Sequence, residues 1–224
     1  RNAIYVWSDT SLFTMRFVGT PFTFAYEQVG TNCGLIGKNA AVEVDGAAYW
    51  MSDNGFFRYT GKLESMDCLV EDFVYDNLNT TSNQFIYCGI NNLFGEITWF
   101  YPTADSNVNT RSVTYSYLDS TAKRPIWFTN ASALFTRTTW QDSAVFGLPH
   151  ATQYDAGTDT SFDVTGNTDG ISYYYEHETG LNQIRLGATT AIPANITSGD
   201  YDITQKVVRG SATNMADLRG DGEN

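Results

Sequence analysis

Histidine is scarce in this sequence of 224 residues, which has only His150 and His177, far apart in the chain. A metal centre built from several histidines is therefore excluded. A Ser-His-Asp arrangement would need an activated serine, and the sequence has no G-x-S-x-G elbow to present one. It also lacks the G-x-x-x-x-G-K-[ST] and G-x-G-x-x-G stretches that hold phosphates. These absences argue against nucleophilic and nucleotide chemistry, and we assign no catalytic, cofactor-binding or metal-binding residue from the sequence.

Cysteine is also rare. Cys33, Cys68 and Cys88 form an odd number and show no C-x-x-C spacing, so a disulfide framework and a zinc site both fit poorly. Free cysteine is usually buried. We therefore expect three buried free thiols in a protein made in a reducing cytoplasm.

Basic residues are outnumbered. Thirteen Lys and Arg face 25 Asp and Glu, which gives a formal net charge of -12 and a pI of about 4.4. A nucleic-acid grip neutralises phosphates with basic side chains, so this balance argues against one. It is compatible with DNA that passes nearby, because an acidic wall repels a polyanion that must slide without adhering.

Long apolar runs are missing as well. No stretch approaches the roughly 18 consecutive apolar residues that a membrane span requires, and no signal-peptide pattern is present. We predict no membrane insertion. The first residues, RNAIYVW, already follow a strand pattern, so we expect the chain to be part of a longer protein.

The residues that are abundant favour strands. Aromatic residues make up 15% of the chain, charged residues only 17%, and Gly numbers 19, a balance typical of pleated strands joined by tight turns. The length suffices for one large all-β domain or two small ones. We predict an all-β fold.

The sequence of one predicted hairpin occurs twice in the chain. The stretches 3–15 (AIYVWSDTSLFTM) and 47–59 (AAYWMSDNGFFRY) each read as strand, turn and strand, 44 residues apart. Five positions are identical: Ala3/Ala47, Tyr5/Tyr49, Ser8/Ser52, Asp9/Asp53 and Phe13/Phe57. Asp9 and Asp53 are suited to fold a carboxylate onto backbone N–H groups in the turn, and Gly55 supplies a positive φ.

A hairpin unit that recurs at this period is typical of β-propeller blades, which bury their faces only against neighbouring blades. Residues 1–208 are therefore predicted to form a β-propeller-like array of antiparallel aromatic hairpins. Whether the chain holds all the blades or only some of them stays open. The polar, unpatterned residues 209–224 are predicted to be a flexible or truncated tail.

Further hairpins are expected at residues 85–102 and 112–129, with single strands at 171–180 and 198–204. The polar stretch 103–111 is expected to be a surface loop. Residues 150–170 are rich in Gly, Asp and Thr, and we expect a loop or a short edge hairpin there. Residues 64–79 fit a short helix or a strand equally well.

Paired carboxylates could still support glycoside hydrolysis, which needs only two acids at a suitable distance across a sugar. The candidates are Asp53, Glu96, Asp142 and Glu176. A sugar platform could come from the five tryptophans, although their strand-like spacing favours the core; they are Trp7, Trp50, Trp99, Trp127 and Trp140. A calcium loop is a weak alternative, since its spacing differs from D-x-D-x-D-G; it would use Asp155, Asp159, Asp163 and Asp169.

The succession of aromatic hairpins resembles one known family. The opening repeat, IGKNAAVEVDGAAYWMSDNGFFRYTG, NNLFGEITWFYP and ISYYYEHETGLN are similar, in this order, to stretches of the tail nozzle and packaged-DNA stabilisation (hub) proteins of short-tailed bacteriophages. The likeness runs from Arg1 to about Ile203. The turn SDNG and the loops at 103–111 and 158–170 depart from the family pattern. Family members are longer, which implies a fragment or a partly ordered subunit.

What the resemblance implies is a virion structural protein, not an enzyme. It would be assembled in the host cytoplasm as a homo-oligomeric ring in the tail, below the portal and its adaptor. Packaged double-stranded DNA would pass through without sequence recognition. The alternative is a carbohydrate-binding or glycoside-hydrolysing propeller module for a host-surface polysaccharide, and an adhesin-like surface module is a third reading.

Overall fold

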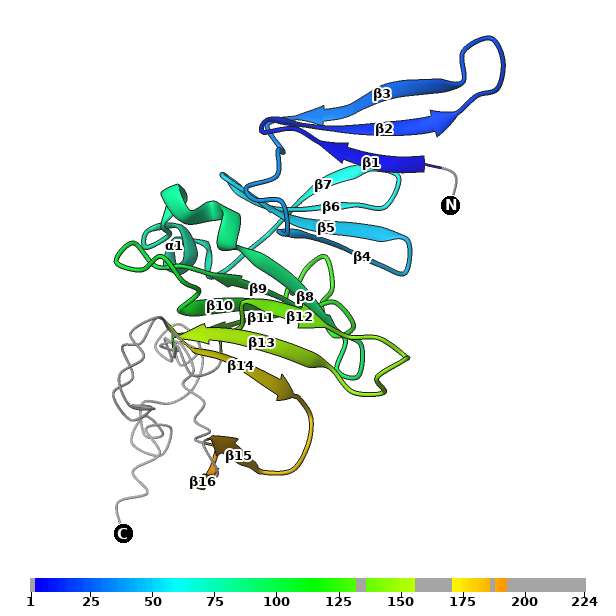
Figure 1. The fold of residues 1–224 in the computed structure, drawn as a ribbon. Coiled ribbons are helices and arrows are strands. Elements are labelled where there is room, and N and C mark those ends of the chain that lie inside the picture. The colour runs from blue at the N-terminus through cyan, green and yellow to red at the C-terminus, as the bar shows by residue number, and fades with distance from the viewer. Residues whose placement is uncertain (1–2, 132–135, 156–170, 186–187, 193–224) are drawn as a thin grey trace, which may run out of the picture. The chain divides into compact units, whose positions relative to one another are not determined.

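The computed structural model describes residues 3–131, 136–155, 171–185 and 188–192 (Figure 1). The chain divides into two compact units, Arg1–Thr179 and Gly180–Asn224. The described residues are mostly strands in antiparallel sheets, so the all-β prediction is confirmed. The predicted tail at 209–224 and the strand expected at 198–204 lie outside the described residues.

In the described part of the first unit, the strands form four sheets. The first contains β1 (Ala3–Trp7), β2 (Ser11–Phe17) and β3 (Phe24–Thr31), and the second contains β4 (Ala41–Val44), β5 (Ala47–Ser52), β6 (Gly55–Tyr59) and β7 (Leu63–Met66). The third contains β8 (Tyr87–Asn91), β9 (Glu96–Tyr101), β10 (Arg111–Ser116) and β11 (Trp127–Asn130). The fourth contains β12 (Thr139–Gln141), β13 (His150–Asp155) and β14 (Ile171–Glu176).

Two short helices, α1 (Glu71–Tyr75) and the 3₁₀ helix η1 (Thr80–Phe85), connect the second sheet to the third. In the second unit, β15 (Asn182–Arg185) and β16 (Ala188–Ala191) form a hairpin. Among the described residues, no helix is both long and apolar enough to cross a membrane.

Each of the four sheets is a meander, in which strands that follow one another in sequence are paired. Local turns produce this order. The loop between β4 and β5 is Asp45-Gly46, and both residues have positive φ, as the two-residue turn of a right-twisted hairpin requires. Gly55, which opens β6, has a φ of 128°. The two hairpins predicted at 85–102 and 112–129 are β8–β9 and β10–β11, and they lie in one sheet.

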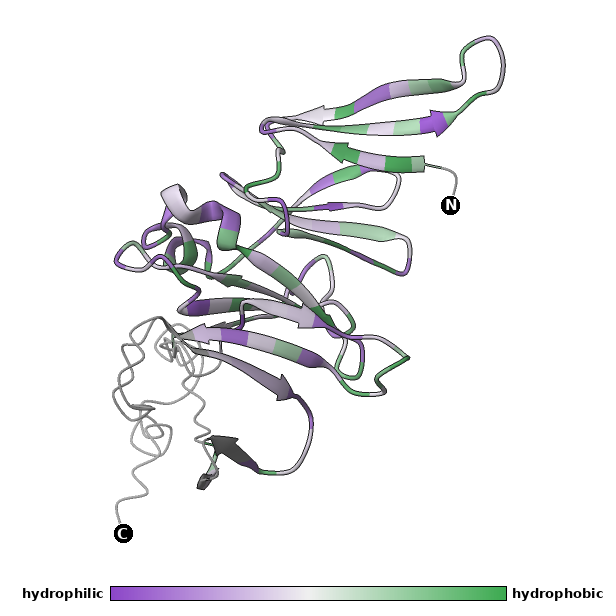
Figure 2. Cartoon of the chain, viewed as in Figure 1, coloured by the Kyte–Doolittle hydropathy of each residue, from purple (hydrophilic) through white to green (hydrophobic). Residues whose placement is uncertain are grey.

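The sequence repeat is a structural repeat. Residues 3–15 lie on β1 and β2, and residues 47–59 lie on β5 and β6. Apolar and polar residues are interspersed along these strands (Figure 2), and successive side chains lie on opposite faces of each sheet. Tyr5 and Trp7 of β1 occupy the same face as their counterparts Tyr49 and Met51 do in β5.

The first sheet packs on the second through aromatic rings. Trp7 lies 5.6 Å from Trp50, and Tyr5 lies 5.5 Å from Tyr59, both between ring centroids and both edge to face. Trp50 is fully buried, and its Nε1 donates a hydrogen bond of 2.9 Å to the carbonyl oxygen of Cys33. Such edge-to-face pairs stabilise beyond the area they bury.

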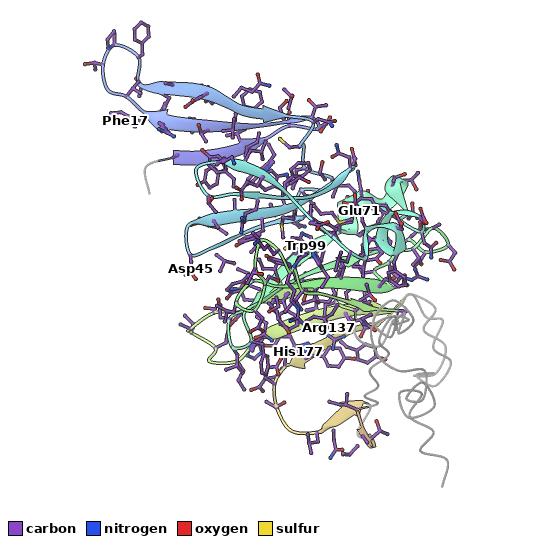
Figure 3. All side chains as sticks on the ribbon, turned by 180° about the vertical axis from the view of Figure 1, so that it is seen from behind. Phe17, Asp45, Glu71, Trp99, Arg137 and His177 are labelled. Carbon is purple, nitrogen blue, oxygen red and sulfur yellow. The ribbon has the colours of Figure 1, made fainter. Side chains whose placement is uncertain are left out.

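The opposite face of the second sheet packs on the third. Between ring centroids, Phe56 lies 5.0 Å from Trp99 and 4.9 Å from Trp127, and Tyr49 lies 6.2 Å from Tyr115. Trp99 is fully buried here (Figure 3), and its Nε1 donates to the carbonyl oxygen of Ala40 at 3.0 Å. The interpretation of Trp50 and Trp99 as core is confirmed.

The first strands of the second, third and fourth sheets are neighbours. β8 contacts both β4 and β12, and the N–H of Cys88 donates to the carbonyl oxygen of Asn39, just before β4, at 2.8 Å. Propeller blades also place their first strands side by side. The described residues show an open series of sheets, and a closed wheel is not seen among them.

The predicted cysteine state is confirmed. Cys33, Cys68 and Cys88 are free and buried. Burial raises the pKa of all three thiols, that of Cys68 to about 12. The thiolate is the reactive form, so these thiols are inert at neutral pH.

The structure corrects the expectation for residues 150–155. They form β13, which pairs with β12 on one side and β14 on the other, and not a loop or an edge hairpin. Ala151 and Gln153 are its buried positions. Because Ala151 is small and Gln153 is polar, the segment shows no alternation of large apolar residues, although its Thr and Tyr residues favour strands. Residues 156–170, which include Asp159, Asp163 and Asp169, lie outside the described residues.

Two other expectations are refined. Residues 64–79 contain the five-residue helix α1, so the short-helix alternative is confirmed, and the end of β7 occupies the first positions of the segment. In the β1–β2 turn, the hydroxyl of Ser8, not the predicted carboxylate of Asp9, accepts backbone hydrogen bonds from Ser11 at 3.0 Å and from Thr10 at 3.4 Å. Serine hydroxyls form such turns by the same mechanism as Asp.

Candidate functional site

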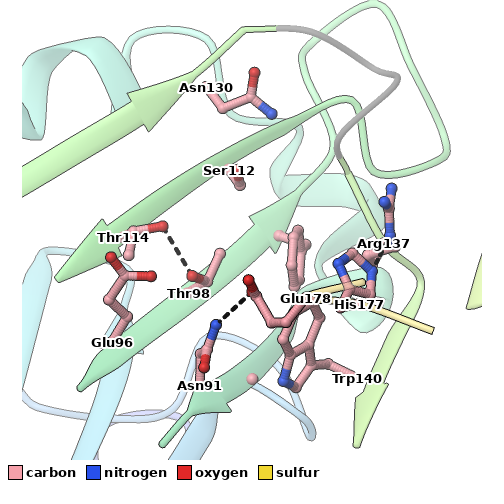
Figure 4. Close-up of a pocket in the computed structure, with 12 residues that line it drawn as sticks. Asn91, Glu96, Thr98, Ser112, Thr114, Asn130, Arg137, Trp140, His177 and Glu178 are labelled. Carbon is pink, nitrogen blue, oxygen red and sulfur yellow. Dashed lines mark hydrogen bonds between the residues drawn. The ribbon is translucent and has the colours of Figure 1, made fainter. Parts of the chain in front are cut away.

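A cavity of about 350 Å³ opens between the third sheet and the fourth (Figure 4). The third sheet contributes its strand residues and the fourth contributes Trp140 of β12. The lining comprises Gly89, Asn91, Glu96, Thr98, Phe100, Ser112, Thr114, Asn130, Arg137, Trp140, His177 and Glu178.

The cavity exists because small polar residues occupy this face of the third sheet. Thr98 of β9 and Thr114 of β10 are paired in register, and their hydroxyls are 2.8 Å apart. On the second sheet, the face toward the following sheet holds Tyr49, Met51 and Phe56, which fill the space up to the third. Hydroxyl-bearing side chains are too small to reach the fourth sheet, so polar space is left between them.

Trp140 forms one wall. Its ring lies 6.0 Å from Phe100 and 4.5 Å from the His177 ring, between centroids. Its Nε1 donates to the carbonyl oxygen of Ile90 at 2.6 Å, which ties β12 to β8. The ring rests against Gly89, where a side chain would collide with it.

Two glutamates lie at the cavity. Glu178 has a φ of 62° and accepts a hydrogen bond of 2.9 Å from the Asn91 amide. Glu96, at the start of β9, has its pKa raised, first by burial and then by the negative charges of Glu178 and Asp119. A carboxyl with a raised pKa beside a second carboxyl is a pattern found at functional sites and also in structural networks.

His177 is held as a neutral acceptor. The Nε–H of Arg137 donates to its Nε2 at 2.9 Å, so the proton of the imidazole belongs on Nδ1. Its pKa is lowered to about 4 by burial, by the Arg137 charge and by His150. Arg137 itself is buried, stacks at 4.4 Å on the Tyr175 ring and donates to the carbonyl oxygen of Thr136.

This arrangement predicts a pH-dependent stability. The folded-state pKa of His177 is below its unfolded value of 6.5, so the neutral form stabilises the fold above pH 6.5, and that contribution is lost as the pH falls toward 4. We expect His177 to account for about 2 kcal/mol of the loss in unfolding free energy over this range, allowing for its partial exposure. Urea unfolding at pH 7 and pH 4.5 measures this loss in unfolding free energy.

The matched control is the other histidine. The variant His177→Gln keeps an acceptor for Arg137 and should lose about 2 kcal/mol less than wild type on acidification. His150→Gln removes only the smallest of the three causes that lower the pKa of His177, so it should keep most of the acid sensitivity of the wild type. Equal acid sensitivity of His177→Gln and the wild type would contradict the assignment.

The structure places the four carboxylates that the sequence offered as candidates in different parts of the fold. Of the four carboxylates considered, only Glu96 lines the cavity. Asp53 lies in the exposed β5–β6 turn, and Glu176 ends β14 opposite His150. Asp142 accepts hydrogen bonds from the backbone and side-chain nitrogens of Asn92 at 2.8 and 2.9 Å, a structural tie between β8–β9 and β12.

Glu178 and Arg137 were not predicted, because nothing in their local sequence marks them. The sequence did offer one signal for the cavity. The repeat leads one to expect aromatic residues on these strands, and small residues stand there instead: Thr98, Ser112 and Thr114. Among the described residues, no group of three or more His, Cys, Asp or Glu is placed to hold a metal ion.

Neither a family model nor a curated protein matches this chain. The interpretation of its function therefore depends on the sequence and on the geometry.

Proposed function

We propose that this chain is a structural protein of a bacteriophage tail, part of a nozzle or hub ring around the DNA exit conduit. Its role is to retain packaged DNA and to take part in genome ejection. The β-propeller-like arrangement, the ring of identical subunits, and the contacts with portal, adaptor and other tail proteins belong to this proposal. It assigns the chain no catalytic step.

The observation that carries the proposal is the repeated meander. One hairpin plan recurs, and successive sheets are joined face to face by tryptophan, tyrosine and phenylalanine pairs. Close-packed interiors have low compressibility and transmit strain, which suits a part that bears load from packaged DNA. The sequence resemblance to tail nozzle proteins and the net charge of -12 point the same way, because an acidic wall does not retain a sliding polyanion.

Genome retention tests this role. Particles assembled without the chain are expected to fill with DNA and then release it, so that their DNA becomes sensitive to nuclease, whereas complemented particles protect it. Particles that lack the chain and still protect their DNA would contradict the retention role.

A second candidate function is favoured by the cavity between the third and fourth sheets. Carbohydrate sites combine an aromatic wall with hydroxyl, amide and carboxylate groups, and Trp140, Thr98, Asn91 and Glu178 supply these. Two carboxylates are also the minimum for glycoside hydrolysis. The alternative is therefore a carbohydrate-binding or glycoside-hydrolysing module for a host polysaccharide.

A glycan array and a reducing-sugar assay on the purified chain discriminate the two functions. The variant Glu178→Gln keeps an acceptor for Asn91, and Asp53→Asn, in an exposed turn, is its control. Micromolar sugar binding that Glu178→Gln weakens and Asp53→Asn leaves intact would support the carbohydrate function. The structural proposal predicts no binding.

A further inference from the structure

One face of the first sheet is apolar and exposed. We call it the open face; it consists of side chains that the strand register places together, Ile4, Val6, Phe13, Met15, Phe17, Phe24, Tyr26 and Gln28. Phe17 is 70% exposed, Tyr26 67% and Ile4 56%. Figure 3 shows Phe17 on the first sheet. A contiguous apolar patch of this kind marks an interaction site on a soluble protein.

The repeat shows what kind of surface this is. In the second sheet, the positions equivalent to Ile4, Val6, Phe13 and Met15 are Ala48, Trp50, Phe57 and Tyr59. The first sheet covers that face, where Trp50 is 0% exposed and Tyr59 7%. The open face therefore has the composition and register of a surface on which another aromatic sheet packs.

Charge favours a second copy of this chain as the occupant. Each copy has a formal net charge of -12, so two copies repel unless they meet where charge is absent. None of the eight open-face side chains is charged. The charged residues of the same strands, Arg16 and Glu27, belong to the other face by register.

The area is also sufficient. The exposed open-face side chains, together with Val18 and Phe22 of the neighbouring loop, which are 54% and 76% exposed, present roughly 700 Å² at about 200 Å² per aromatic ring. A standard interface buries about 800 Å² on each partner. A two-fold contact brings the same patch from both copies together, so no second complementary surface is needed.

We propose that two copies of this chain associate through the open face, with the two first sheets stacked face to face. Packed sheets lie about 10 Å apart and interdigitate their side chains. Phe17, Phe24 and Tyr26 of one copy fill the spaces between those of the other. Phe17 and Phe24 already lie edge to face, 6.0 Å apart between centroids, within each copy. This inference does not depend on the proposed tail role.

Analytical ultracentrifugation of the purified chain tests the proposal. The wild type is expected to be a dimer at about 100 μM, because interfaces of this size have Kd values from micromolar downward. The double variant Val6→Lys/Tyr26→Lys places four like charges in the contact and should raise the Kd at least about 100-fold. Val145→Lys, at a position 87% exposed in the loop before β13, should leave it unchanged.

Near-UV circular dichroism establishes that the double variant keeps its aromatic packing, and the single variant Tyr26→Gln, which adds no charge, should weaken the dimer by a smaller factor. A wild type that stays monomeric at about 100 μM would overturn the proposal. So would a dimer that both open-face variants leave intact, because its contact would then lie elsewhere.

Discussion

Replacing Trp99 with alanine is expected to lower the free energy of unfolding by about 4 kcal/mol, the range measured for fully buried aromatic side chains. Trp99 is 0% exposed and packs against Phe56 and Trp127 between the second and third sheets. The substitution also removes one of the two hydrogen bonds to the Ala40 carbonyl oxygen, which keeps the N–H of Met51 as a donor at 3.1 Å. Urea unfolding followed by circular dichroism measures the change.

Phe128→Ala is the matched control for Trp99→Ala. Phe128 lies on β11 of the same sheet but is 53% exposed, and truncation of an exposed side chain usually changes stability by about 0.5 kcal/mol or less. If Trp99→Ala cost no more than Phe128→Ala, the aromatic contact between the two sheets could not be what stabilises the stack.

Gly89→Ala is expected to cost about 2 to 3 kcal/mol, because it overpacks the junction of the third and fourth sheets. A Cβ at Gly89 would lie 2.5 Å from Cγ of Trp140. The indole cannot easily retreat, since its Nε1 is bonded to the carbonyl oxygen of Ile90 and its backbone oxygen accepts from the Tyr87 hydroxyl at 3.2 Å. Thermal and urea unfolding both report this loss.

A double-mutant cycle shows whether the collision is the cause. In a Trp140→Gly background, which removes the ring and also the Cβ atom that would lie 2.7 Å from the new methyl group, Gly89→Ala should become close to neutral. A penalty that persists in that background would place the cost in the β8 backbone and not in the contact between sheets.

Local patterns predicted the hairpins well. Alternating aromatic residues and Asn, Asp or Gly turns act within a few residues, so β5–β6 and β8–β9 could be recognised directly. β13 was missed because a strand at the centre of a small sheet can bury Ala151 and Gln153 in place of large apolar residues. Its pairing with β12 and β14 is a tertiary property.

The cavity was harder to predict. Asn91 meets Glu178 across the contact between the third and fourth sheets, and Arg137 meets His177 where the chain enters β12 and leaves β14. The way the strands and sheets come together decides which of these residues meet, and the sequence of a single hairpin does not contain that information. Glu96 was considered for its acidity alone, and only the fold shows that burial and Glu178 raise its pKa. The repeat could have indicated where the stack opens, at Thr98 and Thr114.

The most direct test of the proposed tail role is an electron-microscopy reconstruction of the phage particle that carries this chain. We predict density for its stacked β-meanders in a ring below the portal, around the DNA path. A particle without this chain in its tail would contradict the account. So would a map in which the cavity beside Trp140 holds a saccharide and the chain makes no contact with its own copies.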